Sequence, residues 1–256
     1  MKRVFAFIIA VGMMLTASVP AFCADSKTPY NWYCRHTKNG EVPVCDGEMA
    51  FIERYGGYYV DKNIADGQKV IYLTFDAGYE NGNIGKVLDV MKEKNVRGSF
   101  FVLSNLVTRN TDLVKRMADE GHLICNHTAH HKDMTTVGKE EFEKEIRSLE
   151  TVLFEKCGVE CARFYRPPEG RFNEESLSWV SEMGYKTAFW SFAYADWDNA
   201  KQPEPMAAKS KILSATHTGE IILLHPTSAT NAAILGDLID AWRSDGYEFA
   251  TLDALD

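Results

Sequence analysis

The chain has 256 residues, 45% of them hydrophobic and 25% charged, which is the composition of a globular protein and excludes disordered and collagen-like chains. Its 28 Lys and Arg are outnumbered by 36 Asp and Glu, and no run of basic residues occurs. Because phosphate binding needs clustered Lys and Arg, this charge argues against a nucleic-acid partner. The length suits one α/β barrel or two smaller domains.

Residues 1–24 have the pattern of a secretory signal peptide. Lys2 and Arg3 form a positive start, residues 4–19 are mostly apolar, and small residues follow at Ala21 and Ala24. An uncleaved membrane anchor is the alternative, but the apolar stretch is short for a span. We therefore expect an exported protein with no transmembrane segment after the signal is removed.

Export would place the cysteines in an oxidising compartment. Cys23 leaves with the signal, and Cys125 lies in an apolar segment, where we expect a buried free thiol. The other four predict two disulfides, Cys34–Cys45 and Cys157–Cys161. None of the spacings is that of a zinc ribbon.

Two regions follow the signal. Residues 25–67 show little periodicity and are rich in Tyr, Trp, Gly, Asn and Pro, so we expect an ordered extension held by a disulfide. In residues 68–256, short β-branched or aromatic runs alternate with amphipathic helical patterns. Seven strands are predicted, at 70–75, 98–103, 122–125, 164–165, 187–192, 220–224 and 247–250. Six helices are predicted, at 84–94, 111–120, 139–154, 174–183, 205–215 and 232–244. This alternation predicts a parallel barrel or an open parallel sheet.

Residues suited to catalysis follow several of the predicted strands. In a parallel α/β barrel the carboxyl ends of the strands meet at one face, where chemistry collects. Five of these strand ends carry an acid, a histidine or an arginine: Asp76, His127 with His131, Arg166, Asp196 and His225. The pattern predicts a hydrolytic centre at this face.

His127 and His131 are four residues apart, so on one helical turn both imidazoles would face the same way. That spacing suits two nitrogen ligands of one divalent ion. Two solvated histidines in a polar loop are the alternative, which the neighbouring Asp-terminated strand disfavours. His130 lies off this face and is expected to be solvated or to support the ligands. We expect the remaining histidines to be structural: His36, His122 and His217.

Two charged pairs are expected behind this face. Asp76 ends an apolar strand, where an unpaired carboxylate is costly, and Arg166 is its natural partner. His225 follows three apolar residues, and Asp196 would orient it and keep it protonated near neutral pH, as a general acid requires. A structural His–Asp pair is the alternative.

These residues lie in motifs that resemble those of a known family. Thr-Phe-Asp, His-Thr-x-x-His, Arg-Pro-Pro-x-Gly, Asp-Trp and Leu-Leu-His-Pro occur in the order of the five motifs of the polysaccharide deacetylases, the NodB-homology carbohydrate esterases. The resemblance covers residues 68–256. LTFDAGYENG at 73–82, FWSFAYADW at 189–197 and IILLHP at 221–226 are similar to the subgroup that forms muramic δ-lactam in spore cortex peptidoglycan. The resemblance implies a distorted, incomplete (β/α) barrel that removes N-acetyl groups from a glycan.

The resemblance also implies a divalent metal ion. His127 and His131 would hold zinc, which would polarise the acetamide carbonyl and lower the pKa of bound water. Most of the family has a second Asp at the position of Ala77, and the subgroup usually has Asn. Alanine cannot ligate a metal, so we expect an ion held weakly by two nitrogens and water.

The remaining roles are likewise implied by the resemblance. Asp76 would take a proton from the attacking water and His225 would give one to the departing amine, with Arg166 and Asp196 orienting them. Glu169 stands where the family has an aromatic residue, which would alter how the glycan lies. Glycan contacts are expected from four residues: Tyr79, Glu169, Tyr194 and Trp197.

The sequence therefore predicts a secreted, monomeric de-N-acetylase that acts on a peptidoglycan glycan strand in the cell wall or spore envelope. Its expected target is N-acetylmuramic acid without peptide, where the freed amine can close on the lactyl carboxyl. A chitin, xylan or N-acetylglucosamine deacetylase is the first alternative. A catalytically silent glycan-binding relative is the second, and the presence of Asp76 and His225 argues against it.

Overall fold

The computed structural model describes residues 26–255, so the predicted signal peptide lies outside the described residues. Its centre is a curled sheet in which every pair of neighbouring strands is parallel. The strand order is β10 (Glu248–Ala250), β3 (Val70–Ala77), β4 (Ser99–Val102), β5 (Leu123–Asn126), β6 (Ala162–Tyr165), β8 (Lys186–Ala188) and β2 (Gly57–Tyr58). β9 (Glu220–Leu224) also pairs with β3. All seven predicted strands are present, and the predicted incomplete barrel is confirmed.

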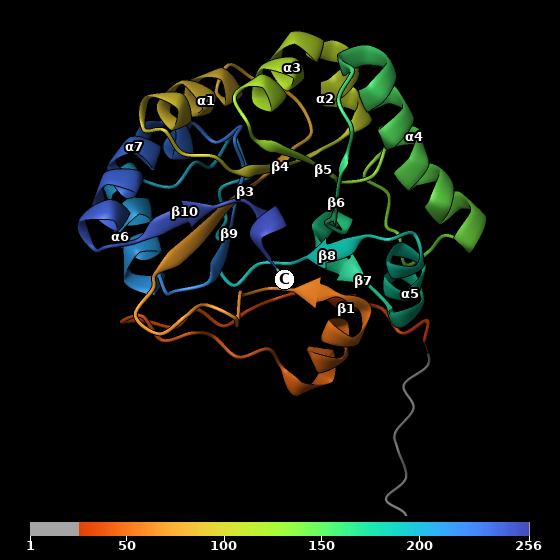
Figure 1. Ribbon diagram of the computed structural model, residues 1–256, viewed down its shortest axis with the longest axis horizontal. Helices are drawn as coiled ribbons and strands as arrows, with labels where there is room; N and C mark the ends of the chain where they lie inside the picture. Colours follow the sequence, from red (N-terminus) through yellow and green to blue (C-terminus); the bar gives the residue numbers. More distant parts are fainter. Residues whose placement is uncertain (1–25, 256) are drawn as a thin grey trace, which may run out of the picture.

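The helices form an arc around the outside of the sheet (Figure 1). They are α1 (Ile84–Glu93), α2 (Ser104–Arg109), α3 (Thr111–Asp119), α4 (Lys139–Cys157), α5 (Glu174–Glu182), α6 (Pro205–Ala215) and α7 (Ala229–Ser244). The six predicted helices are found, and α2 is an additional one. None of the helices within residues 26–255 combines the length and the apolarity that crossing a membrane requires.

Alternation along β3 divides the core into two sides. Leu73 and Phe75 belong to the larger apolar cluster, which includes Val87 of α1 and Leu238 of α7. Tyr72 belongs to a separate cluster inside the curl of the sheet. Because successive side chains of a strand point to opposite faces, Asp76 comes to lie on the inner side with Tyr72.

The N-terminal extension lies across the open side of the barrel (Figure 1). Trp32 and Ile52 form an apolar cluster with Phe172 and Phe189 of the barrel region. Within the extension, β2 adds a strand beside β8, although two residues are too few to show periodicity in the sequence. β1 (Tyr30–Asn31) pairs with β7 (Arg171–Phe172). The extension is thus built into the wall of the barrel.

The predicted strand at 187–192 ends early, at Ala188. The carbonyls of Ala188 and Phe189 accept hydrogen bonds from the side chain of Arg166, at 2.8 Å and 3.2 Å. Beyond Ala188, the Phe189 N–H donates to the Tyr58 carbonyl at 2.7 Å, and the chain pairs again with β9 where Phe192 lies beside Ile222. Arg166 thus takes up backbone acceptors at the end of the shortened strand.

The two predicted disulfides are wrong. The described cysteines are all free thiols: Cys34, Cys45, Cys125, Cys157 and Cys161. The Cys45 thiol donates to the carbonyl of Asp46 at 3.3 Å, and the Cys157 thiol to that of Thr111 at 3.9 Å. Each of these two sulfurs is thus hydrogen-bonded to a backbone carbonyl. Cys125 is buried, as predicted.

Candidate active site

A cavity of about 840 Å³ opens at the carboxyl ends of the strands. Eight of the predicted site residues line it: Asp76, Tyr79, His127, His131, Glu169, Tyr194, Trp197 and His225. Arg166 is buried behind Asp76, and Asp196 is buried behind His225. Residues separated by up to about 150 positions in the chain are thus brought to one place.

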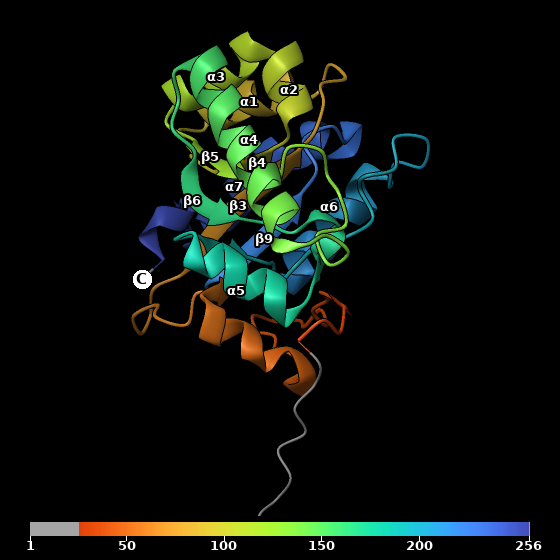
Figure 2. The same ribbon diagram turned by 90° about the vertical axis from the view of Figure 1, so that its right-hand side faces the viewer.

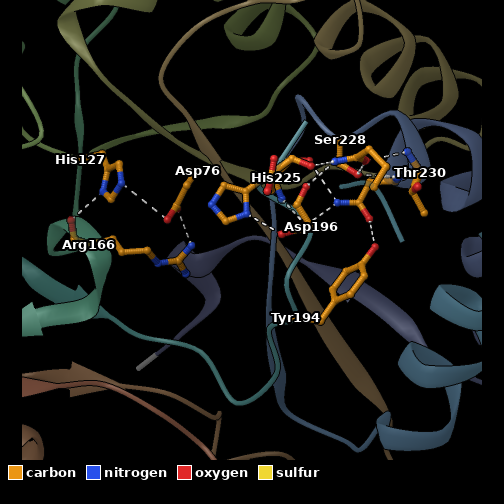
Figure 3. Close-up of polar contacts among 11 residues, drawn as sticks. Asp76, His127, Arg166, Tyr194, Asp196, His225, Ser228 and Thr230 are labelled. Atoms are coloured by element: carbon orange, nitrogen blue, oxygen red, sulfur yellow. Dashed lines mark hydrogen bonds and ion pairs between the residues drawn. The ribbon is translucent and has the colours of Figure 1, made fainter. Parts of the chain in front are cut away.

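Asp76, near the end of β3, is held by the guanidinium of Arg166 (Figure 3). Arg166 Nη1 donates to Asp76 Oδ1 at 2.8 Å, and Nη2 donates to the Thr74 hydroxyl at 2.9 Å. Burial acts to raise the pKa of Asp76, but the charge and hydrogen bond of Arg166, together with the charge of His225, outweigh it and lower the pKa. Asp76 is therefore an ionised carboxylate, 10% exposed at the cavity.

His225 directly follows β9 and is oriented by Asp196 (Figure 3). Its Nδ1 lies 2.7 Å from Asp196 Oδ1, and its backbone N–H donates to Oδ2 at 2.8 Å. Burial acts to lower the pKa of His225, but the hydrogen bond and charge of Asp196, together with Asp76, raise it above its ordinary value. Because His225 Nδ1 is hydrogen-bonded to Asp196, Nε2 is the ring nitrogen available to a molecule bound in the cavity.

His127 and His131 lie in a loop, and the predicted helical turn is wrong. Thr128 and His131 have φ values of 71° and 57°, in the left-handed region that a right-handed helix excludes. The two rings are nevertheless adjacent, with centroids 5.0 Å apart. His127 Nδ1 donates to the Arg166 carbonyl at 2.8 Å, and its Nε2 lies 3.6 Å from Asp76 Oδ2. Burial lowers the pKa of His127 to about 4, so the imidazole is neutral.

This loop is anchored by Glu145 of α4, which the sequence analysis missed. The Glu145 carboxylate accepts the backbone N–H of His130 at 2.9 Å, and His130 Nδ1 lies 2.9 Å from its other oxygen. Asn126 Oδ1 accepts the N–H of Thr128 at 2.9 Å. The available signal was an acidic residue on the apolar side of a predicted helix.

Trp190, also missed, forms part of the cavity wall and depends on the extension. Trp32 Nε1 donates to the Trp190 carbonyl at 2.8 Å, and the Trp32 N–H donates to the Gly170 carbonyl at 2.8 Å. Gly170 has a φ of +67°, and a Cβ there would lie 2.8 Å from the Trp190 ring, so a larger residue does not fit. Glu169, with a φ of 57°, is presented at the cavity by this turn.

Exposed aromatic side chains stand at the rim of the cavity. Tyr79 is 45% exposed and Trp197 is 62% exposed. Asn199 Nδ2 donates to the Tyr79 hydroxyl, which joins the loop after β3 to the loop between β8 and α6. The second loop projects from the body of the protein in Figure 2. Apolar rings at a polar opening provide surfaces on which sugar rings can stack.

The two imidazoles fit a divalent ion as a pair of nitrogen ligands. His127 is neutral, its Nδ1 is fixed by a carbonyl, and the ring of His131 is adjacent, which is the arrangement metal-bound histidines adopt. Ala77 is fully buried in the apolar core and supplies no ligand. Within residues 26–255, no group of three His, Cys, Asp or Glu side chains is placed to hold an ion. Two protein ligands would leave the other coordination positions open.

The motif order, the barrel and this cavity agree with the comparison to known families. The profile of the polysaccharide deacetylase family matches residues 63–188, which contain Asp76, His127, His131 and Arg166. The chain belongs to the polysaccharide deacetylase family, and its chemistry is that of a de-N-acetylase.

Particular relatives extend the match beyond this stretch. The chain is 37% identical over 251 residues to the peptidoglycan-N-acetylmuramic acid deacetylase PdaA of Bacillus subtilis, covering 98% of this chain and 92% of that protein. The solved structure of PdaA, a family 4 carbohydrate esterase, matches with a TM-score of 0.85 and 38% identity, covering 90% and 97% of the two chains. A chitooligosaccharide deacetylase of Rhizobium leguminosarum is 37% identical over 199 residues, covering 71% and 89%. The resemblance seen in the sequence is confirmed.

Proposed function

We propose that this protein removes the N-acetyl group from N-acetylmuramic acid residues of peptidoglycan that lack a peptide. The observation that carries the proposal is the placement of Asp76 and His225 at one cavity, each held by its own buried partner (Figure 3). The similarity to PdaA over nearly the whole chain supports the choice of sugar.

The reaction needs one proton acceptor and one proton donor. Asp76 accepts a proton from the water that attacks the acetamide carbonyl. His225 gives the proton of its Nε2 to the amide nitrogen, so the C–N bond breaks to release acetate and leave a free amine on the sugar. Arg166 keeps Asp76 ionised, and Asp196 keeps His225 turned toward the substrate.

Zinc is the ion we assign to His127 and His131. When bound, it would polarise the acetamide carbonyl and stabilise the negative charge that develops on its oxygen. The Arg166 carbonyl fixes the His127 ring for this purpose. Tyr79, Tyr194 and Trp197 would stack on sugar rings, and Glu169 would contact the glycan beside them.

The biological setting is part of the proposal. A signal peptide at residues 1–24 would direct export and then be cleaved. The mature protein would be a monomer consisting of the extension, 25–67, and the deacetylase domain, 68–256. In the cell wall or spore envelope, the free amine of a peptide-free muramic acid would lie near its lactyl carboxyl, as δ-lactam formation in spore cortex requires. N-terminal sequencing of the exported protein tests the cleavage.

The substrate is tested with three glycans given to the mature protein. Peptide-stripped peptidoglycan, intact peptidoglycan and a chitooligosaccharide are incubated with zinc, and the products are analysed by mass spectrometry. Loss of acetyl groups from muramic acid in the stripped material is the expected result. Preferential deacetylation of the chitooligosaccharide would favour the function that the Rhizobium relative's name describes. The Asp76→Asn variant, in which the proton acceptor is removed, serves as the inactive control.

A further inference from the structure

Asn231 is a buried polar residue that belongs to none of the family motifs found in the sequence. It lies in the first turn of α7, where the Ser228 hydroxyl accepts its backbone N–H at 3.1 Å. Its side chain is enclosed, with 1% of the residue exposed. A buried amide is retained where both of its ends have hydrogen-bond partners, because each unpaired end would be costly.

The Asn231 amide contacts three residues of the site. Nδ2 donates to Asp196 Oδ2 at 2.5 Å and to the His225 carbonyl at 3.1 Å. Oδ1 accepts the hydroxyl of Tyr194, a cavity residue. One side chain thus joins the loop after β8, the end of β9 and the start of α7.

Asn231 completes the hydrogen bonding of Asp196. The carboxylate is 1% exposed and accepts from the His225 ring, the His225 backbone N–H and Asn231 Nδ2. Two of these donors, the ring and the backbone N–H of His225, belong to the residue that Asp196 itself must orient. Asn231 is therefore the side chain that fixes the carboxylate independently of His225, and it does so without adding a charge.

The position of Asn231 is itself secured by a second side chain. Gln202 Nε2 donates to the Asp196 carbonyl at 3.0 Å, and its Oε1 accepts the Ser228 hydroxyl at 2.6 Å and the Thr230 N–H at 3.2 Å. The start of α7 is thus tied to the loop that carries Asp196. The amide of Asn231 lies within this connection.

We propose that Asn231 is a positioning residue for proton donation by His225. It holds the Asp196 carboxylate so that Oδ1 faces His225 Nδ1, which leaves Nε2 directed at the nitrogen of the leaving amine. The inference rests on the proposed role of His225. It predicts that Asn231 matters when the leaving group must be protonated and matters little when it need not be.

Two substrates separate these cases. Peptide-stripped peptidoglycan has an amine leaving group that must receive a proton, whereas 4-nitrophenyl acetate releases a stable anion without one. Asn231→Ala should lower kcat on the amide by about tenfold, the size expected for a lost hydrogen bond to a charged group. Hydrolysis of the ester should change less than the amide reaction. Equal losses on both substrates would overturn the proposal.

A second measurement does not depend on the ester. If Asn231 acts through His225, Asn231→Ala should have little further effect on the amide rate in a His225→Ala background. Multiplicative losses in the double variant would contradict the proposal. If His225→Ala itself impaired both substrates equally, the proposed role of His225 would fail; a selective loss in His225→Ala but not in Asn231→Ala would refute only the present inference.

The design guards against an effect on folding. Asn231→Asp is nearly isosteric and places a like charge against Asp196, so it should lower the amide rate at least as much as Asn231→Ala while preserving packing. Asn173→Ala removes another buried amide, which caps α5 far along the chain from this network. It should lower thermal stability without changing the ratio of amide to ester rates. If Asn173→Ala changed the ratio of amide to ester rates, that ratio would report stability alone, and the proposal would lose its support.

Discussion

The buried Arg166 provides a strong test of how the site is held together. Its guanidinium is fully enclosed, donates to Asp76 and Thr74, and lies 4.1 Å from the centroid of the Phe101 ring. Arg166→Met keeps an apolar side chain of similar length but leaves the Asp76 carboxylate without its cation. Removing one partner of a buried pair costs about 3–5 kcal/mol, because the remaining charge is not compensated.

Two backbone groups add to this loss. The carbonyls of Ala188 and Phe189 each accept from Arg166, and each would lose a bond worth about 1 kcal/mol. The double variant Arg166→Met/Asp76→Asn leaves no unpaired charge at this position, so it should be more stable than Arg166→Met alone by about 2 kcal/mol or more. Urea unfolding of the two variants and the wild type measures these free energies.

A matched substitution three residues earlier in the chain controls for the loss of an arginine. Arg163 is in β6, but its side chain is 62% exposed and it pairs with Glu150 at the surface. Arg163→Met should change the free energy of unfolding by about 1 kcal/mol or less. The reasoning is refuted if Arg163→Met and Arg166→Met are equally destabilising, or if the double variant is no more stable than Arg166→Met.

Three further predictions concern the proton donor, the metal and a buried acid. His225→Ala should remove the fall in kcat on the alkaline side of the pH profile along with most of the rate, because that fall reports loss of the proton that His225 donates, and Asp196 raises the pKa at which it is lost; an unchanged profile would contradict its role. Ala77→Asp buries a carboxylate beside the site, so the metal-free variant should be less stable than the wild type, while calorimetry should show zinc affinity higher by about tenfold; equal affinities would show that zinc is not held there. Glu220 is fully buried, and burial raises its pKa well above 4.5 although the His217 backbone N–H opposes this. As the pH rises above 4.5, the unfolded chain releases a proton that the folded protein keeps, so urea unfolding should show the wild type losing up to about 1.4 kcal/mol per pH unit relative to Glu220→Gln; parallel stability curves for the wild type and Glu220→Gln would refute this.

The fold of residues 68–256 was predictable because its elements are long enough to show their periods. α1 and α4 have apolar faces that recur at helical spacing, and β3 and β9 are continuous buried runs. β2 has two residues and no pattern of its own, so its place beside β8 depends on tertiary contacts. β8 ends at Ala188, whose carbonyl accepts from the Arg166 side chain, and this early end was likewise invisible in the sequence.

The candidate site was predictable to the extent that it follows from the ends of strands. Asp76 and His225 come next to apolar runs whose carboxyl ends must share one face of a parallel barrel. The conformation between His127 and His131 was not predictable from the sequence. A spacing of four residues does not distinguish a helical turn from a loop with a left-handed residue at Thr128. Asn231 was missed because its partners lie on segments that only the folded chain brings together.

The two charged pairs explain how one cavity keeps a base and an acid in opposite states. Asp76 and His225 are near enough that each influences the other: the charge of His225 lowers the pKa of Asp76, and the charge of Asp76 raises the pKa of His225. Arg166 donates a hydrogen bond to the Asp76 carboxylate, and Asp196 forms a hydrogen bond with the His225 imidazole. Each group therefore has its own buried partner of opposite charge, which favours the ionised carboxylate and the protonated imidazole at the same time. The cavity between them is where an amide can take a proton from one side while losing its acyl group to water on the other.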